Sequence, residues 1–470
     1  MIMNRKFALI VLSALTLTSC ARALPLQSSG ITPPSLWSRM THADTKLDLN
    51  SVIIADDKAS VEHQWWMHFK DDTLNALVKE AVANNKNLGM AKARVEEAWA
   101  NMGYAKANQL PQIDGVVKPK RGNEGLATGD KPKGQIDLTL QATWELDVFG
   151  RNLPRLAQTE AILQSADASQ QAVLVGLLAE VGRNYFDLRD YQKQIELTQK
   201  NLENQRKTLE LIKAQQKGAL VGDFDVQRAS AQVSTTESKL PALKTAYEVT
   251  LNRLNVLLGA APGEKDKLIQ TEVALQPLDQ RIIVAAPATV LANRPDVKVA
   301  ERDFAASISN KKAAEKLIFP KITLLTFFGV QESNVLATYP WSMGITLIQP
   351  VLDFGRIKTQ INAANAQQHQ AFLHYQETVL EALENMENAL TAYKNEVIRN
   401  GLLRTSYEQN RKAADLAEQQ FQGGAIGLLD VLVAQNNVLE AESALADSDA
   451  SLRKDLVSIY AAAGGGWQVE

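Results

Sequence analysis

Two aspartates that follow glycine-rich turns are the side chains in this sequence best placed for chemistry. Asp225 and Asp430 each come a few residues after such a turn, 205 positions apart. A ring of carboxylates attracts cations and, when paired with a base on a neighbouring helix, can latch a pore. An acid in the first turn of a helix is equally stabilised by the helix dipole, so both roles stay open. The glycines of the two turns are Gly218 and Gly222 before Asp225, and Gly423, Gly424 and Gly427 before Asp430.

Motifs typical of enzymes are missing from the sequence. It contains no GxSxG, GxxxxGK[ST] or HExxH pattern. The pairs His63/His68 and His369/His374 are each five residues apart, which is poor spacing for a metal site on one helix. We therefore predict a protein that is not an enzyme, with no catalytic residues, no metal site and no cofactor.

The single cysteine, Cys20, closes an N-terminal targeting signal. A short basic segment precedes an apolar run at 7–17, which ends at small residues as in a secretory signal peptide. Residues 17–20 resemble a bacterial lipobox, in which cleavage leaves a lipid-bearing cysteine at the new N-terminus. We predict a signal peptide at 1–19 and lipidation of Cys20. A plain signal peptide with an incidental cysteine is the alternative.

Composition narrows the class of protein further. The 470 residues carry 50 Lys plus Arg against 53 Asp plus Glu, so no basic excess is available for phosphates and we predict no nucleic-acid partner. Aromatic residues make up only 6%, which favours long helices over a large globular core. After the signal, no apolar run approaches the roughly 18 residues of a membrane helix. A membrane-spanning part would therefore have to be built from strands.

The chain contains one unit twice. An offset of 205 carries Phe149-Gly150-Arg151 onto Phe354-Gly355-Arg356, and it also relates apolar positions that step by seven. We expect each copy to hold a helix (72–108, then 295–317), two strands, a very long helix, a glycine-rich turn and a shorter return helix. The stepping positions are Val226, Val233, Leu240, Tyr247 and Leu254, which become Val431, Val438, Leu445, Leu452 and Ile459.

Heptad spacing marks the very long helices. Leu174, Val181 and Leu188 begin a series that continues seven apart, and Val379, Leu383 and Met386 begin one that alternates steps of four and three. A repeat of 3.5 residues keeps one seam against a partner helix, as in a coiled coil. The first of these helices is expected at about 154–217, roughly 95 Å at 1.5 Å per residue.

The clearest strand lies at 135–147, where apolar and polar residues alternate strictly. A period of two gives one apolar and one polar face, over a length close to the roughly 9–11 residues of a strand that crosses a bilayer. The segments 321–331 and 341–352 are also expected to be strands, and 113–118 is a weaker candidate. Standing alone, such strands are more often part of a soluble sandwich.

Four strands per chain cannot close, and an open edge in lipid would leave backbone groups unpaired. Three chains would supply twelve strands, enough for a barrel with a water-filled lumen. On this interpretation Asp137 and Glu145 line the pore, while Trp144 and Trp341 face lipid. The predicted fold class is mainly α with a transmembrane β-barrel, made by a trimer of duplicated units that continue as a helical tunnel.

These residues resemble the TolC-like outer membrane factor family, in particular its OprM- and NodT-like efflux lipoproteins. The resemblance covers nearly the whole mature chain, and the motifs occur in the family's order. They are Trp65-Trp66 with Phe69, Leu110-Pro111, Trp144-Glu145-Leu146-Asp147-Val148-Phe149-Gly150-Arg151, Arg294-Pro295-Asp296-Val297, Phe319-Pro320, Asp353-Phe354-Gly355-Arg356 and Gly464-Gly465-Gly466-Trp467.

The resemblance implies a homotrimer in the outer membrane of a Gram-negative bacterium, anchored by outer-membrane lipid and extending into the periplasm. It implies a passive exit duct that receives small molecules from an inner-membrane RND-type pump through a periplasmic adaptor. The glycine turns would contact the adaptor, and Asp225, Asp430 and Leu429 would form the periplasmic gate. The family often has an acid and a base where this chain has Val433 and Asn436, so a weaker latch or packing by Leu429 alone is implied.

The predicted organisation follows from the repeat and the resemblance together. It comprises a signal peptide (1–19), a lipidated segment and equatorial wrap (20–71), repeat 1 (72–258), an equatorial linker (259–286), repeat 2 (287–462) and a tail (463–470). A TolC-like duct for a type I protein secretion system and a structural coiled-coil lipoprotein without a pore are the alternatives. The amphipathic strands disfavour the structural lipoprotein.

Overall fold

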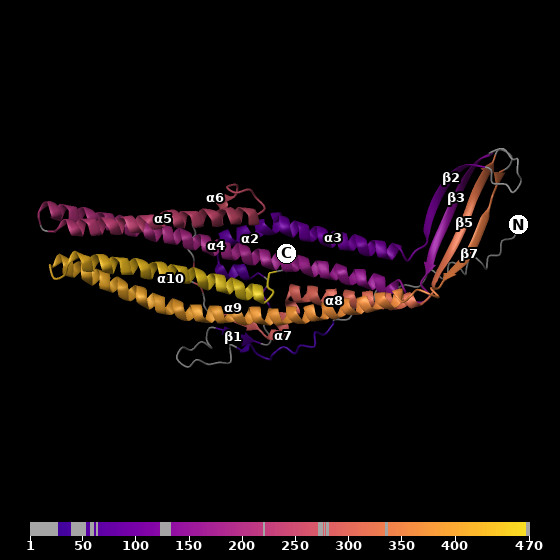
Figure 1. Ribbon diagram of the computed structural model, residues 1–470. Coiled ribbons are helices and arrows are strands. Elements are labelled where there is room, and N and C mark those ends of the chain that lie inside the picture. Colours follow the sequence, from indigo (N-terminus) through magenta and orange to yellow (C-terminus); the bar gives the residue numbers. More distant parts are fainter. Residues whose placement is uncertain are drawn as a thin grey trace.

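The computed structural model describes residues 27–38, 53–56, 61–62, 64–122, 133–219, 221–270, 276, 278, 282–333 and 337–466. The predicted signal peptide and Cys20 lie outside these residues. The molecule is a long rod, with strands at one end and the turns of two helical hairpins at the other (Figure 1). A smaller set of elements surrounds its middle.

The two copies of the repeat have the same order of elements. Copy one contains α2 (Asp72–Asn84), α3 (Lys86–Ala107), β2 (Gln112–Gly122), β3 (Lys133–Leu146), α4 (Leu153–Lys217) and α5 (Asp223–Leu257). Copy two contains α7 (Pro287–Asn293), α8 (Pro295–Glu315), η5 (Lys316–Ile318), β5 (Lys321–Ser333), β6 (Ala337–Thr338), β7 (Trp341–Ile348), α9 (Arg356–Gln422) and α10 (Leu428–Ala462). The predicted duplication and the long helix at 154–217 are therefore confirmed.

Four helical staves, side by side, form the wall of the rod. The helix α4 packs against α5, α3, α8 and α10, and α9 packs against α8 and α10. Figure 1 shows that α10 and α8 follow one another along one line, as do α5 and α3. The order across the wall is therefore α5/α3, α4, α10/α8 and α9. With 65 and 67 residues, α4 and α9 are each about 100 Å long at 1.5 Å per residue.

The two end-to-end junctions are built alike. The Asn85 side chain donates to the Leu257 carbonyl at the end of α5 (2.8 Å), and Arg294 donates to the Ala462 carbonyl at the end of α10 (2.7 Å). Gly259 and Gly464, again 205 apart, have φ of +73° and +79°. A Cβ at Gly259 would lie 2.2 Å from the Asn84 carbonyl oxygen, so only glycine fits there.

The prediction of one helix over 72–108 was wrong, because Asn85 interrupts it. Asn85 has extended backbone angles, and its side-chain oxygen accepts a hydrogen bond from the Leu88 amide as the cap of α3. Such local bonding by asparagine favours helix ends over helix interiors. The break frees the side-chain amide of Asn85 to hold the end of α5.

The strands form one antiparallel sheet in the order β2, β3, β5, with β7 and the short β6 both paired to β5. The weak candidate at 113–118 is a full strand of 11 residues, because it pairs along its length with β3. The prediction for 341–352 was too long: β7 ends at Ile348, before Pro350, which has no amide to donate to a ladder. Among the described residues, β2 and β7 have one long neighbour each.

The register separates the residues of the sheet into two faces. Leu140 pairs with Phe328, which pairs with Trp341, so apolar residues of three strands lie on one face. Trp144 is on this face too, and its indole donates to the Gln109 carbonyl at the foot of the strand (2.8 Å). The apolar face also carries Ile113, Val117, Ile136, Leu138, Met343, Ile345 and Leu347, all of them exposed in the single chain.

A collar of smaller elements lies around the staves at mid-length (Figure 1). It includes β1 (Ile53–Asp56), η4 (Trp65–Phe69), α6 (Asp266–Ile269) and β4 (Ile282–Ala285), with β1 and β4 paired in parallel. Its core is closed by Trp37 and Trp65, which are 1% exposed and pack with residues of α4, α9 and α10. In the part of the chain that is described, we find no helix with both the length and the apolarity of a membrane span.

Candidate functional site

The hairpin turns hold the predicted gate acids as helix caps. The Asp225 carboxylate accepts a hydrogen bond from the Gly222 amide, and Asp430 accepts one from the Gly427 amide, both at 3.3 Å. Each aspartate is the third residue of its helix, α5 or α10, where the exposed amides and the helix dipole favour a negative charge. Within one chain the two acids therefore have a structural role, while Asp430 stays exposed to solvent.

The five glycines of the turns are not equally required. Only Gly424 has a positive φ, +69°, whereas Gly218, Gly222, Gly423 and Gly427 have φ between −79° and −86°. In the first hairpin the left-handed residue is Ala219, with φ of +56°. The conformational reason for glycine thus applies to one turn residue, and a Cβ at Gly222, Gly423 or Gly427 would make only ordinary van der Waals contacts.

Apolar side chains at the hairpin tips are exposed to solvent in the single chain. Phe224 is 72% exposed, Leu429 40% and Val433 50%. The packing predicted for Leu429 is not made within the chain. Instead of an acid–base latch, the tips have a neutral bond across the hairpins, from the Gln232 amide to the Asn436 side-chain oxygen (3.0 Å). Asn436 in turn donates to Glu440 on its own helix (2.9 Å).

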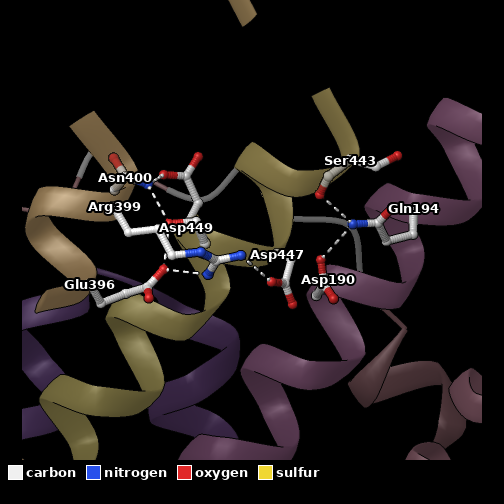
Figure 2. Close-up of polar contacts among 9 residues, drawn as sticks. Asp190, Gln194, Glu396, Arg399, Asn400, Ser443, Asp447 and Asp449 are labelled. Carbon is white, nitrogen blue, oxygen red and sulfur yellow. Dashed lines mark hydrogen bonds and ion pairs between the residues drawn. The ribbon is translucent and has the colours of Figure 1, made fainter. Parts of the chain in front are cut away.

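A polar cluster further along the hairpins ties α9 to α10 (Figure 2). Arg399 of α9 pairs with Glu396 (2.9 Å) and with Asp447 of α10 (3.3 Å). Asn400, which is 1% exposed in the seam, donates to Asp449 (2.8 Å) and to Ser448. A satisfied polar residue in an apolar seam fixes the register of two helices.

The same cluster continues from α10 to α4. The Gln194 side chain donates to the Ser443 carbonyl (2.8 Å), and Figure 2 shows Asp190 beside it. Lys454 of α10 pairs with Asp187 of α4 (2.7 Å). The same two helices also meet through buried Leu452, Leu456 and Val457, and nearer the tips Leu432 packs against the apolar cluster of the first hairpin. Polar and apolar contacts therefore alternate where the second hairpin is attached to the first.

Several carboxylates lie close together in this polar cluster. Burial raises the pKa of Asp190, the Asp447 charge adds to the rise, and the hydrogen bond from Gln194 opposes it. Burial, and then the nearby Glu396, raise the pKa of Asp455 to about 6. Protonation of these carboxyl groups at lower pH thus reduces the repulsion between negative charges within the polar cluster.

The predicted lumen acids lie on the polar face of the sheet, each beside a lysine of a neighbouring strand. Glu145 pairs with Lys321 of β5 (2.8 Å), and Asp137 lies 3.9 Å from Lys120 of β2. This face also carries Gln112, Asp114, Thr139, Gln141, Thr143, Thr323 and Thr346, with the apolar Leu325 and Phe327 among them, as the register shows. Charges of both signs therefore line the polar face.

Sequence reasoning found the tips and the strand faces but missed the polar cluster of Figure 2. Asn400 stands three residues after Val397, where the heptad series of apolar residues would continue, and this polar interruption is the signal that could have marked the cluster. The equivalence of Asn85 and Arg294 at the helix junctions was also missed, because the two residues differ in type. The glycines 205 residues apart beside them were a usable signal.

A sheet with one apolar and one polar face, continued by long helical staves, defines a subunit of a tunnel-forming outer-membrane channel. The sequence pattern of the outer membrane efflux protein family matches residues 77–260 and 286–465. The chain belongs to this family, and each matched stretch holds one copy of the repeated unit. Its place is accordingly the outer membrane of a Gram-negative bacterium, with the helices extending into the periplasm.

Individual relatives agree over almost the whole length. The chain is 30% identical to "Nodulation protein T" of Rhizobium leguminosarum bv. viciae over 86% of this chain and 84% of that protein. It is 29% identical to the pyoverdine export outer membrane protein OpmQ of Pseudomonas putida, over 100% and 99% of the two chains. The solved outer-membrane channel OprN is 30% identical, with a TM-score of 0.83 over 91% of this chain and 98% of that one.

Proposed function

We propose that this chain is the exit duct of a tripartite efflux system, in which three copies conduct small molecules passively across the outer membrane. The two-faced sheet with open edges is the observation that carries the proposal. One chain cannot satisfy those edges in lipid, whereas β7 of one copy can pair with β2 of the next. Twelve strands would then enclose a lumen lined by the polar face with Asp137 and Glu145.

The helical wall supports the same arrangement. Four staves per chain, in three copies, make a closed tunnel that continues the lumen for about 100 Å, given the rise of 1.5 Å per residue. The hairpin tips then surround its far end, where Asp225 and Asp430 would form a ring of six carboxylates. The open apolar residues Phe224 and Leu429 suit contact with a neighbouring copy and with a periplasmic adaptor.

Anchoring and partners complete the proposal. Lipidation of Cys20 would hold the N-terminal segment at the membrane, in keeping with residues 27–38, which lie against α9 through Gln376 and Glu387 and against α8 through Glu301. An inner-membrane pump of the RND type would deliver substrate through the adaptor. Among relatives, OpmQ is named for pyoverdine export and CusC for cation efflux, so the family name does not fix a substrate. The division at 72–258 and 287–462 is the domain organisation that we propose.

Conductance of purified protein in a planar bilayer tests this function. Wild-type protein is expected to give single channels that stay conducting without nucleotide or proton gradient. A matched pair of variants probes the strand edge: Gly344→Pro removes an amide from the ladder of β7, whereas Gly344→Ala keeps it. We expect channels from the alanine variant and few or none from the proline variant. Wild-type protein that inserts without conducting would contradict the duct.

A further inference from the structure

A cavity of about 550 Å³ lies in the wall where α10 ends and α8 begins. Because this stave is interrupted, neither helix fills the space between α4 and α9 at that height. Small residues leave the space open: Ala172, Gly176 and Ala179 of α4, Ala389 and Ala392 of α9, and Ala461 of α10. The volume is within the range of about 300–1,000 Å³ that is usual for small-molecule pockets.

The cavity borders the core of the collar, because Ala179 of α4 and Ala389 of α9 belong to both. On α4 the lining residues Ala172, Val175, Gly176, Ala179 and Arg183 step by three or four positions along most of their length, as residues on one face of a helix do. The helical wall that holds this cavity lines the tunnel of the proposed duct, so the inference rests on that function.

Two charged residues of the cavity have no partner in the described part of the chain. Arg294 is already engaged, since it pairs with Asp296 and donates to the Ala462 carbonyl. Arg183 of α4, which is exposed, and Asp455 of α10, which is half-buried, make no hydrogen bond or ion pair with any described residue. The cavity therefore offers one open positive and one open negative group on different walls.

We propose that this cavity is a transient binding site for a small amphoteric organic molecule, whose ammonium group pairs with Asp455 and whose anionic group lies beside Arg183. The two residues line the same cavity without forming an ion pair with each other, so a molecule with both charges can engage both. A carboxylate that is partly removed from water binds an ammonium group more strongly than an exposed one does. The alanine walls accept the apolar body of such a molecule.

The site requires an ionised Asp455. Burial and the Glu396 charge on α9 raise the pKa of Asp455 to about 6, and Lys454 on its own helix opposes the rise. Arg183 on α4 and the Arg294–Asp296 pair at the start of α8 line the same cavity. The ammonium contact is thus available above about pH 6 and is lost as the pH falls through that value.

Three fluorescent probes that share a dansyl group test the proposal on the purified full-length channel. Nε-dansyl-lysine carries both charges, dansylcadaverine only the ammonium group, and dansylglycine only the carboxylate. We expect Nε-dansyl-lysine to bind best at pH 7.5 and to lose affinity on acidification, with a midpoint near 6. Asp455→Asn should weaken Nε-dansyl-lysine and dansylcadaverine by about tenfold, the effect of one charged contact, and leave dansylglycine unchanged.

Control variants make the outcome specific. Arg183→Gln should weaken Nε-dansyl-lysine but not dansylcadaverine, and Asp415→Asn, which removes an exposed acid elsewhere on α9, should change neither. Equal binding of Nε-dansyl-lysine by wild type and Asp455→Asn, or binding by none of the proteins, would overturn the site. Bilayer conductance of the same preparations separates this failure from a failure of the duct: conducting channels without probe binding reject only the site.

Discussion

At the scale of single residues, the tip aspartates combine two effects that substitutions can separate. Asparagine at 225 and 430 keeps an oxygen that accepts the glycine amide but removes the charge, whereas alanine removes both. We expect both double variants to lose cation preference, measured as the reversal potential in a salt gradient. Only the alanine variant should also lose the cap, which is worth about 0.5–1 kcal/mol per helix. Unaltered ion preference in both variants would reject the carboxylate gate.

Asp455 makes the folding stability fall as the pH rises, which is the opposite of the effect of a salt-bridged acid. Its folded pKa of about 6 lies above the ordinary aspartate pKa of 3.8, so the folded state binds more protons between these values. The stability contributed by protonation is complete below about pH 4 and is lost as the pH rises through 6. Asp455→Asn should therefore have a free energy of unfolding about 1 kcal/mol larger than that of wild type at pH 7.5, after allowance for solvent screening. Its melting temperature should be higher at pH 7.5 and equal to that of wild type at pH 4. A constant difference at both pH values would contradict this origin.

At the scale of elements, the end-to-end junctions depend on a glycine in each copy. Gly259→Ala would place a Cβ 2.2 Å from the Asn84 carbonyl oxygen, on a backbone of positive φ. We expect the α5/α3 junction to open and the melting temperature to fall, with a loss of at least about 2 kcal/mol from the combined clash and strain. Gly103→Ala, within α3 and with open space around its Cβ, is the control and should be neutral or stabilising. Equal melting of the two variants would show that the junction tolerates a side chain.

The polar cluster between the hairpins depends on Lys454, because that lysine pairs with Asp187 of α4 and lies near Asp190 and Asp447. Lys454→Met would leave these carboxylates without it, and their repulsion should loosen α10 from α4. Hydrogen exchange is expected to rise in α10 between Asn436 and Asp447. Lys412→Met, on the exposed side of α9, should leave that segment unchanged. No increase in exchange for Lys454→Met would mean that the apolar contacts alone hold the hairpins together.

The helices and strands were predicted from the sequence more accurately than the contacts between the end of one helix and the start of another. Heptad positions such as Val181 and Tyr393 are buried as expected, because a 3.5-residue repeat requires a partner helix on one side. Alternation in β3 likewise predicted the two faces of the sheet. The break at Asn85 and the cavity at Asp455 could not be predicted, since both depend on where the end of one helix meets the start of another. That contact joins residues 168 or more positions apart.

At the scale of the whole molecule, the open edges of β2 and β7 and the exposed apolar face call for association. Residues such as Trp341, 75% exposed, and Phe354, 91% exposed, would be costly in water but are suited to lipid and to the interface with it. The same geometry explains why a single chain is incomplete: its four staves form only part of a tunnel wall. Trimerisation would pair the open edges of β2 and β7 between copies, and the same association would close the tunnel.

The mass of the detergent-extracted particle, measured by native mass spectrometry beside that of Cys20→Ala, tests whether the protein is a lipidated trimer. We expect three chains per particle, each cleaved before Cys20 and carrying acyl mass. The Cys20→Ala particle should still be trimeric, because the strand edges and not the lipid hold the copies together. A wild-type particle of one chain would contradict the trimeric duct, since the sheet would then have no means of closing in the membrane.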